Sequence, residues 1–285
     1  MGLIVNTNVA AMTAQRNLKM NTRNVTESLE RLATGYRINK ASDDIAGLNI
    51  SEILRTQIRG YQVAIRNAQD GVSLLQIAEG GYQTITENVQ RIRELTVQAA
   101  NGTYSTTERT AIAREVYQRM EDIDRIATTI KFNNTELLSG NTSEAVLQIG
   151  ANNVAVDTLD IAPALQTMTS GALGLSGLVD ATVAAGGAYE NATAARTYLD
   201  TLDAALETIF ERRTQVGAYS QRLDSVINNL EITVENLTAS ESRIRDLDIA
   251  EETTRLTRNQ VLQQATTSVL AQANQLPLLA LSLLG

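Results

Sequence analysis

The chain has 285 residues, a mass of 30.9 kDa and a formal net charge of −8, and it contains no Cys, His or Trp. The absence of Cys excludes disulfides, thiolate metal sites and cysteine nucleophiles, and the absence of His excludes Ser-His-Asp triads and HExxH metal sites. The acidic balance and the scattered arginines argue against a nucleic-acid partner. No apolar run is long enough to span a bilayer. We therefore expect no cofactor, no metal, no catalytic residue and no membrane insertion.

Both ends of the chain are uncharged. Residues 1–15 and 259–285 contain no charged side chain, and both stretches are about half apolar. Such ends would be poorly soluble on a monomer, because large exposed apolar patches promote association. They pack either on each other within one molecule or against other molecules. The N-terminus also lacks the basic segment of a secretory signal peptide, so the protein is either cytosolic or exported without a cleaved signal.

Two helices are predicted in the N-terminal third. The first covers about residues 5–34 and is followed by Gly35, a residue type that commonly ends helices. The second is long and covers about residues 42–100. Ser42 is its expected N-cap, with two aspartates in the first turn, and an Asn-Gly pair follows at its end.

The long helix carries an apolar stripe with alternating spacings of four and three residues. This is the coiled-coil period, which keeps one seam of the helix against a partner. The stripe consists of Leu54, Ile58, Tyr61, Ile65, Ala68, Val72, Leu75, Ala78, Tyr82, Ile85, Val89 and Ile92.

The middle of the chain has a different pattern. A helix is predicted at about residues 106–130, with Thr106 or Thr107 as its cap. Alternating apolar and polar residues at 146–149 and 154–161, separated by a turn sequence, predict a β-hairpin. The Gly- and Ala-rich stretch from Gly171 to Gly187 is expected to be a loop.

The C-terminal half has a stricter repeat. Every seventh residue from Leu202 is apolar: Leu202, Ile209, Val216, Leu223, Leu230, Leu237 and Ile244. The predicted fold is therefore mainly α, a long antiparallel coiled-coil helical bundle formed by the N- and C-terminal halves, with a small β-hairpin. A chain that buries its apolar ends against identical copies makes a heterologous contact, which propagates as a helical filament.

At this point the sequence resembles bacterial flagellin. The resemblance is carried by 4–8 (IVNTN), 29–35 (LERLATG), 37–48 (RINKASDDIAGL) and 90–95 (QRIREL) near the N-terminus, and by 242–246 (SRIRD), 263–265 (QQA) and 268–275 (SVLAQANQ) near the C-terminus. It covers roughly residues 1–140 and 195–285. The central piece is short, so the resemblance implies a flagellin with only the two domains that the family shares.

The resemblance implies a structural subunit, not an enzyme, that polymerises with itself into the flagellar filament, the propeller for swimming. It divides the chain into an inner filament-core domain, 1–41 with 246–285, and an outer-tube domain, 42–245, with the hairpin near 146–161 and a loop-rich excursion near 165–190. The residues assigned to core assembly are Leu3, Ile4, Val5, Leu18, Val261, Leu262, Val269, Leu270, Leu276 and Leu279. The residues assigned to the heptad core are Leu54, Ile58, Ile65, Val72, Leu75, Leu202, Ile209, Val216, Leu223, Leu230 and Leu237.

Further partners follow from the same resemblance. These are flagellar cap and hook-associated proteins, and an export chaperone at the C-terminal end. Recognition by the host Toll-like receptor for flagellin would involve Gln90, Arg91, Glu94, Leu95, Gln98 and Glu115. The alternative for that segment is that its residues serve only helix packing and subunit contacts. Export of an unfolded chain by the type III apparatus would place the protein outside the cell, or in the periplasm of a bacterium with internal flagella.

Three other functions compete with a filament subunit. A coiled-coil signalling or adaptor rod should have charged, soluble ends and usually a membrane anchor, and this chain has neither. A hook–filament junction protein should lack the 268–275 signature. A helical enzyme is disfavoured because the chain has no His, no Cys and no clustered carboxylate pair.

Overall fold

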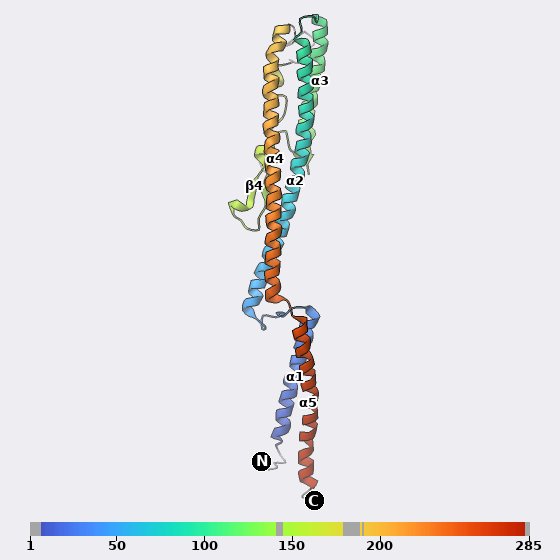
Figure 1. Ribbon diagram of the computed structural model, residues 1–285, viewed down its shortest axis with the longest axis vertical. Coiled ribbons are helices and arrows are strands. Elements are labelled where there is room, and N and C mark those ends of the chain that lie inside the picture. Colours follow the sequence, from blue (N-terminus) through green and yellow to red (C-terminus); the bar gives the residue numbers. More distant parts are fainter. Residues whose placement is uncertain (1–6, 141–144, 179–188, 190, 283–285) are drawn as a thin grey trace. The chain divides into compact units, whose positions relative to one another are not determined.

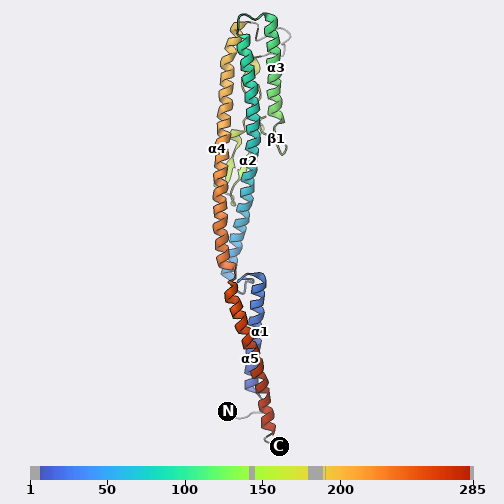
Figure 2. The ribbon, with the colours of Figure 1, turned by 45° about the vertical axis from the view of Figure 1, so that its right-hand side comes forward.

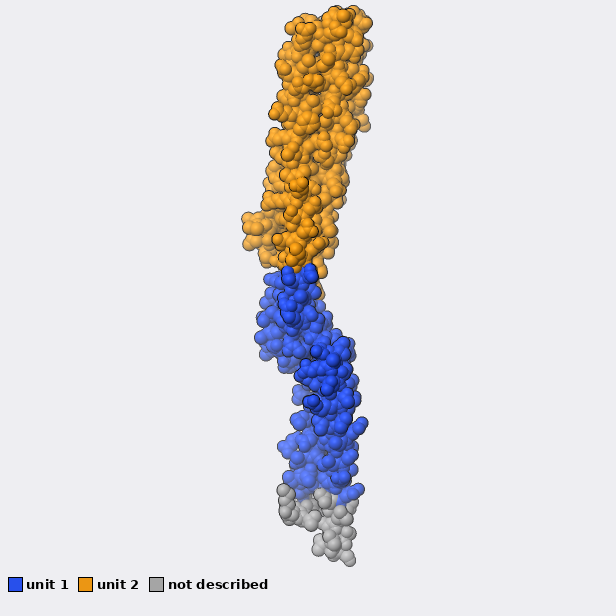
Figure 3. All heavy atoms as spheres, in the orientation of Figure 1, with its two compact units in different colours: residues 1–58, 235–285 blue, residues 59–234 orange. Residues whose placement is uncertain are grey.

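The computed structural model describes residues 7–140, 145–178, 189 and 191–282, with only the backbone course for 276–282. The chain divides into two compact units. Unit 1 contains residues 1–58 and 235–285, and unit 2 contains residues 59–234, shown in blue and orange in Figure 3.

The described residues are mainly helical, which confirms the predicted fold class (Figure 1). Helices α2 and α4 are each more than fifty residues long and run through both units. The elements are α1 (Val9–Thr34), α2 (Ile45–Ala99), α3 (Thr106–Thr129), β1 (Lys131–Phe132), β2 (Thr135–Glu136), β3 (Val146–Gln148), η1 (Ala155–Asp157), β4 (Thr158–Asp160), η2 (Ala162–Ala164), η3 (Leu175–Gly177), α4 (Ala192–Arg245) and α5 (Ile249–Ser282).

In unit 2, α2, α3 and α4 run side by side in both ribbon views (Figures 1 and 2). Their facing stripes form one hydrophobic core, which also receives Leu159, Ile161 and Leu165 from the segment after β3. Ion pairs cross from α2 to α4 outside this core. Arg213 contacts Glu79 at 2.6 Å and Arg93 contacts Asp203 at 2.6 Å. The heptad spacing of the sequence thus produces a three-helix core rather than a simple two-stranded coil.

The start of α2 differs from the sequence prediction. The helix begins at Ile45, and the carboxylate of Asp44 accepts a hydrogen bond from the backbone N–H of Gly47 at 2.9 Å. The expected cap, Ser42, lies in the preceding turn and is exposed. Asp44 caps the helix better because a carboxylate at the N-terminus satisfies a free N–H and also interacts favourably with the helix dipole.

The end of α2 is closed by an arginine from α3. The guanidinium of Arg109 is buried and donates to the backbone oxygens of Ala99 and Asn101, each at 3.1 Å. Ala99 is the last residue of α2, so its carbonyl is one that the helix itself leaves without a partner, and Asn101 lies in the turn that follows. Arg109 therefore ties the α2–α3 connection together.

The cap of α3 is Ser105, not Thr106 or Thr107. Its side chain accepts from the Glu108 N–H, and the Glu108 carboxylate accepts from the Ser105 N–H, which makes a capping box. Hydrogen bonds to this carboxylate from the Ser105 N–H and the Ser105 hydroxyl lower the pKa of Glu108. The prediction missed by one residue because several Ser and Thr residues stand in a row.

The predicted hairpin is present, but its paired part is short. β3 and β4 are antiparallel, with Val146 opposite Asp160 and Gln148 opposite Thr158. A 3₁₀ turn, η1, occupies residues expected to belong to the second strand. Part of the expected loop-rich excursion, residues 179–188 and 190, lies outside the described residues.

A second small hairpin, β1–β2, was not predicted. It pairs Lys131 with Glu136 and Phe132 with Thr135 around two asparagines. Asn133 and Asn134 have φ angles of 43° and 73°, the left-handed conformation that such a two-residue turn requires. The Asn-Asn pair between Phe132 and Thr135, two residue types that favour strands, was the signal that could have revealed it.

In unit 1, α1 and α5 lie side by side (Figures 1 and 2). α1 ends at Gly35 as predicted, with a φ of 74° and its N–H bonded to the Arg31 oxygen. The chain then pairs with the break between α4 and α5. The N–H of Arg37 donates to the Arg245 oxygen at 2.7 Å, and the N–H of Leu247 donates to the Gly35 oxygen at 3.0 Å.

Candidate functional site

The facing sides of α1 and α5 follow the coiled-coil spacing, but small and polar side chains fill most of the seam. On α1 the buried positions recur every seven residues as Ala14, Asn21 and Ser28. Four residues after each of them stand the half-buried Leu18, Val25 and Leu32. On α5 the less exposed positions are Glu252, Leu256, Asn259, Gln263, Thr266, Leu270 and Ala273. This spacing of four and three holds one seam together without a large apolar core.

Hydrogen bonds across this seam join the two helices. The Asn21 side-chain amide donates to the Thr266 hydroxyl at 3.1 Å. The Gln263 amide donates to the Thr22 hydroxyl at 3.0 Å. Polar residues at buried seam positions specify register because a shifted alignment leaves them without partners.

Several large apolar side chains of the pair face outward. Val9 is 65 % exposed, Met12 61 %, Val261 58 % and Val269 54 %. A groove of about 530 Å³ runs along the pair, lined by Val9, Ala10, Thr13, Ala14, Asn17, Ala265, Thr266 and Val269. Exposed apolar surface of this kind marks a protein–protein contact.

The residues expected to serve core assembly fall into three groups. Val261, Leu262 and Val269 are exposed on the outside of α5. Leu18 and Leu270 are half-buried in the seam between α1 and α5. Five more lie outside the described residues or side chains: Leu3, Ile4, Val5, Leu276 and Leu279.

The residues expected in the heptad core are buried to different degrees. Buried in unit 2 are Leu75, Leu202, Ile209, Val216, Leu223 and Leu230. Ile65 and Val72 are half-buried in unit 2, and Leu54, Ile58 and Leu237 are half-buried in unit 1. The start of α2 and the end of α4 therefore bury their stripe less completely than the rest of these helices does.

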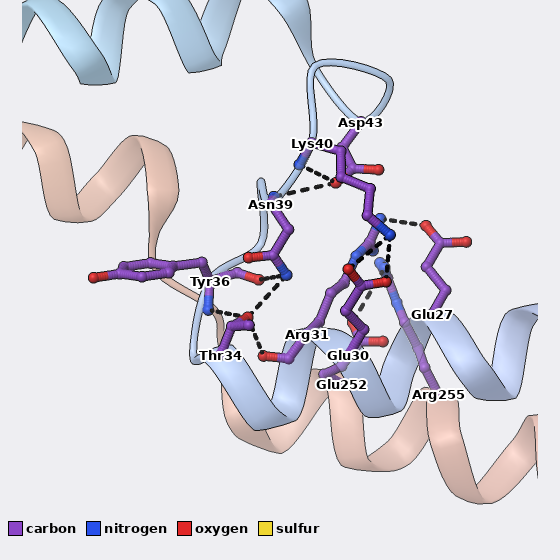
Figure 4. A network of polar contacts seen from close by, with 10 residues as sticks. All are labelled: Glu27, Glu30, Arg31, Thr34, Tyr36, Asn39, Lys40, Asp43, Glu252 and Arg255. Atoms are coloured by element: carbon purple, nitrogen blue, oxygen red, sulfur yellow. Dashed lines mark hydrogen bonds and ion pairs between the residues drawn. The ribbon is translucent and has the colours of Figure 1, made fainter.

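A polar cluster joins the end of α1, the following loop and the start of α5 (Figure 4). Lys40 contacts Glu30 at 2.7 Å and Arg31 contacts Glu27 at 2.6 Å. Glu252 is buried, with Arg255 at 3.9 Å. Alternating charges of this kind hold the loop to the helix end, and each exposed pair contributes little on its own.

Asp43 organises the loop within this cluster. Its carboxylate accepts from the backbone N–H of Lys40 at 3.0 Å and of Asn39 at 3.1 Å. These hydrogen bonds to the charged form, that from Lys40 above all, lower the pKa of Asp43. The two aspartates that follow Ser42 thus have separate roles, since Asp43 closes the loop and Asp44 caps α2.

The segment assigned to receptor recognition forms a charged surface on α2 and α3. The Arg91 guanidinium contacts both Glu94 and Glu115 at 3.1 Å. Hydrogen bonds to Glu94 and Glu115 raise the pKa of Arg91. Gln90 and Gln98 are exposed on the same helix, whereas Leu95 is buried in the core.

The polar clusters described above consist of ion pairs and hydrogen bonds within the chain. Within the described residues, no group of three or more acidic side chains could hold a metal ion. No described helix combines the length and the apolar composition needed to cross a membrane.

Two tyrosines are buried in the core, and burial raises the pKa of Tyr189 to about 12.

Comparison with known protein families gives two matches. Residues 5–143 match the bacterial flagellin N-terminal helical region. Residues 199–284 match the bacterial flagellin C-terminal helical region. Together they include α1, α2, α3, most of α4 and all of α5.

Individual relatives match over the whole length. The chain is 41 % identical over 282 residues to a flagellin of Halalkalibacterium halodurans, covering 99 % of this chain and 100 % of the relative. It is 42 % identical over 292 residues to the flagellar filament 33 kDa core protein of Treponema phagedenis, with the same coverage. Among solved structures, that of a putative flagellar hook-associated protein from Vibrio parahaemolyticus shares the fold at 18 % identity, with a TM-score of 0.55, covering 72 % of this chain and 100 % of that one.

Proposed function

This chain belongs to the bacterial flagellin family, and we propose that its α1–α5 pair is the element that packs against other copies in the filament core. The protein is a structural subunit of the flagellar filament, and its part in motility follows from that. Flagellins are structural proteins, and we propose no catalytic activity for this one.

The observation that supports the assignment is the arrangement of side chains around the α1–α5 pair. The pair buries small and polar residues between its helices and exposes Val9, Met12, Val261 and Val269. Burying one such side chain contributes about 1.5–3 kcal/mol relative to leaving it in water. Contact with further copies removes this apolar surface from water, which a monomer cannot do.

An asparagine at Val269 tests the proposal. Val269→Asn keeps the size of the side chain but places an amide in the apolar contact, where it lacks a partner. We expect the concentration needed for polymerisation to rise about tenfold or more, measured by sedimentation and electron microscopy. Ser268→Asn changes the exposed polar neighbour and serves as the control. Normal polymerisation of Val269→Asn would remove this face of α5 from the contact.

We also propose that residues 42–245 form the outer-tube domain of the filament. The proposed partners are cap and hook-associated proteins, and an export chaperone that binds the C-terminal end. The buried heptad stripe of α4 suits the outer tube, because it holds α4 against the core of unit 2 and leaves the exposed side of the helix for neighbouring subunits. Secretion through the flagellar export apparatus would place the filament outside the cell or in the periplasm. Immunogold electron microscopy of intact and permeabilised cells tests this placement, because an antibody reaches a periplasmic filament only after permeabilisation.

Recognition by the host Toll-like receptor is proposed for the surface around Arg91. This surface combines exposed Gln90 with the Arg91 contacts to Glu94 and Glu115. Arg91→Ala should reduce receptor activation by the monomer in a reporter assay. Arg93→Ala, which removes the ion pair with Asp203 instead, is the matched control. Equal activity of the two variants would favour the alternative that Arg91 serves only packing.

A further inference from the structure

The solvent-facing side of α4 in unit 2 is acidic. Outside the buried stripe that contains Ile209 and Leu223, the exposed positions of α4 include Glu207, Phe210, Glu211, Asp224, Glu231 and Ile232, which we call the acidic face. All six residues are exposed. Within the described residues, none of the four carboxylates makes an ion pair.

This arrangement is unfavourable for the isolated helix. Glu207 and Glu211 stand four residues apart, and like charges at this spacing destabilise a helix by about 0.2–0.5 kcal/mol. Arg222 is exposed on the same helix, but it lies two residues before Asp224 and therefore points to a different side. The helix does not compensate its own acidic face.

The acidic face also carries two large apolar side chains. Phe210 is 46 % exposed and Ile232 is 60 % exposed. A surface with apolar anchors surrounded by charges of one sign has the composition of a contact with an oppositely charged partner. Such a partner must offer cations flanking an apolar side chain.

The same unit carries such a surface on α2. Arg59, Val63 and Arg66, which we call the basic face, lie on the side of α2 opposite to Ala68 of the core. Val63 is 46 % exposed, and neither arginine makes an ion pair within the described residues. Asp70, one turn beyond Arg66, is exposed and does not neutralise it.

The two faces match in spacing as well as in charge. Arg59 and Arg66 are seven residues apart, or about 10.5 Å along the helix. Asp224 and Glu231 are also seven residues apart. Two carboxylates on α4 can therefore meet two guanidiniums on α2, with Val63 between the charges.

From this match we propose that the acidic face of α4 docks on the basic face of α2 in a second copy of the chain. The inference rests on assembly of the chain into a filament, and it assigns the charged residues that align neighbouring subunits. The contact joins two different surfaces, so each copy can donate one face and receive the other, and the contact repeats without closing.

Charge reversal tests this pairing. Arg59→Glu with Arg66→Glu reverses the basic face. Two further variants reverse the acidic face: Glu207→Lys with Glu211→Lys, and Asp224→Lys with Glu231→Lys. Each reversal alone brings like charges together, so the polymerisation concentration should rise about tenfold or more. Combining the basic-face reversal with an acidic-face reversal in one chain should restore polymerisation. The acidic pair that restores it also gives the axial offset between copies.

Arg114→Glu on α3 is the matched control, because Arg114 is exposed and makes no ion pair among the described residues. For every variant, the helix content and the melting temperature should equal those of the unaltered chain. Arg59→Gln with Arg66→Gln provides a milder variant if Arg59→Glu with Arg66→Glu unfolds the chain. Failure of both combined chains to polymerise better than the single reversals would overturn the pairing. Failure of the unaltered chain to polymerise would instead contradict the proposed function.

Discussion

The hydroxyl of Tyr82 on α2 donates a hydrogen bond of 2.7 Å to the backbone oxygen of Ala164. Both residues are fully buried, and 82 positions of sequence separate them. Burial raises the pKa of Tyr82 well above its usual range. The bond holds the segment after the β3–β4 hairpin against the three-helix core of unit 2.

Removing this hydroxyl should destabilise unit 2. Tyr82→Phe keeps the ring but leaves the Ala164 oxygen buried without its partner, which costs about 1–3 kcal/mol. Denaturant unfolding followed by circular dichroism measures the change. In the control, Tyr104→Phe, the lost hydroxyl is bonded to Gln98 near the surface, and the effect should stay within about 0.5 kcal/mol.

Truncating two adjacent residues of α4 should affect the free energy of unfolding to very different degrees. Ile209 is fully buried, whereas Phe210 is 46 % exposed. Ile209→Ala opens a cavity in the core and should lower the free energy of unfolding by about 2–5 kcal/mol. Phe210→Ala should affect stability little and polymerisation more. Similar losses of stability in both variants would show that α4 has rotated from the orientation described.

The cap of α3 can be identified by two alanine substitutions. Ser105→Ala removes the hydroxyl that accepts from the Glu108 N–H, and the expected loss is about 1 kcal/mol. Thr106→Ala changes the residue that the sequence alone suggested as cap, and it should have a smaller effect. A larger loss from Thr106→Ala in thermal unfolding would move the cap by one residue.

Acid should loosen the loop after α1. Hydrogen bonds from Lys40 and Asn39 lower the pKa of Asp43 in the folded chain. The stabilisation is therefore complete above the ordinary aspartate pKa of about 4, and it is lost as the pH falls through the lowered value. Asp43→Asn should reduce protection of the loop amides at pH 7, measured by hydrogen exchange, and should remove their loss of protection in acid. An unchanged acid response in this variant would assign the effect to other carboxylates, and Asp224→Asn is the matched control.

Helix α4 shows which features of the fold could be predicted from the sequence. The seven-residue repeat from Leu202 identified its buried stripe, because a coiled-coil period places those residues on one side of a helix. Gly35 marked the end of α1 for a similarly local reason, since it has the left-handed conformation that ends the helix. The caps at Asp44 and Ser105 were missed by one or two residues, because several capping residues compete there.

The α1–α5 pair shows where sequence was insufficient. The uncharged ends indicated burial, but they could not separate packing within the chain from packing between chains. Ala14, Asn21 and Ser28 did not stand out as a seam, because apolar residues are usually expected to face the partner helix. Their burial became evident only once α5 was in place.

By itself, the sequence determined the helices, their period and the neutral ends, because these depend on local spacing and composition. Only the tertiary structure decided that Leu18 and Leu270 lie in the seam while Val261 and Val269 face outward. The physical reason is that a periodic stripe records which residues share a face of a helix. It does not record which of two partners, the same chain or another copy, will cover that face.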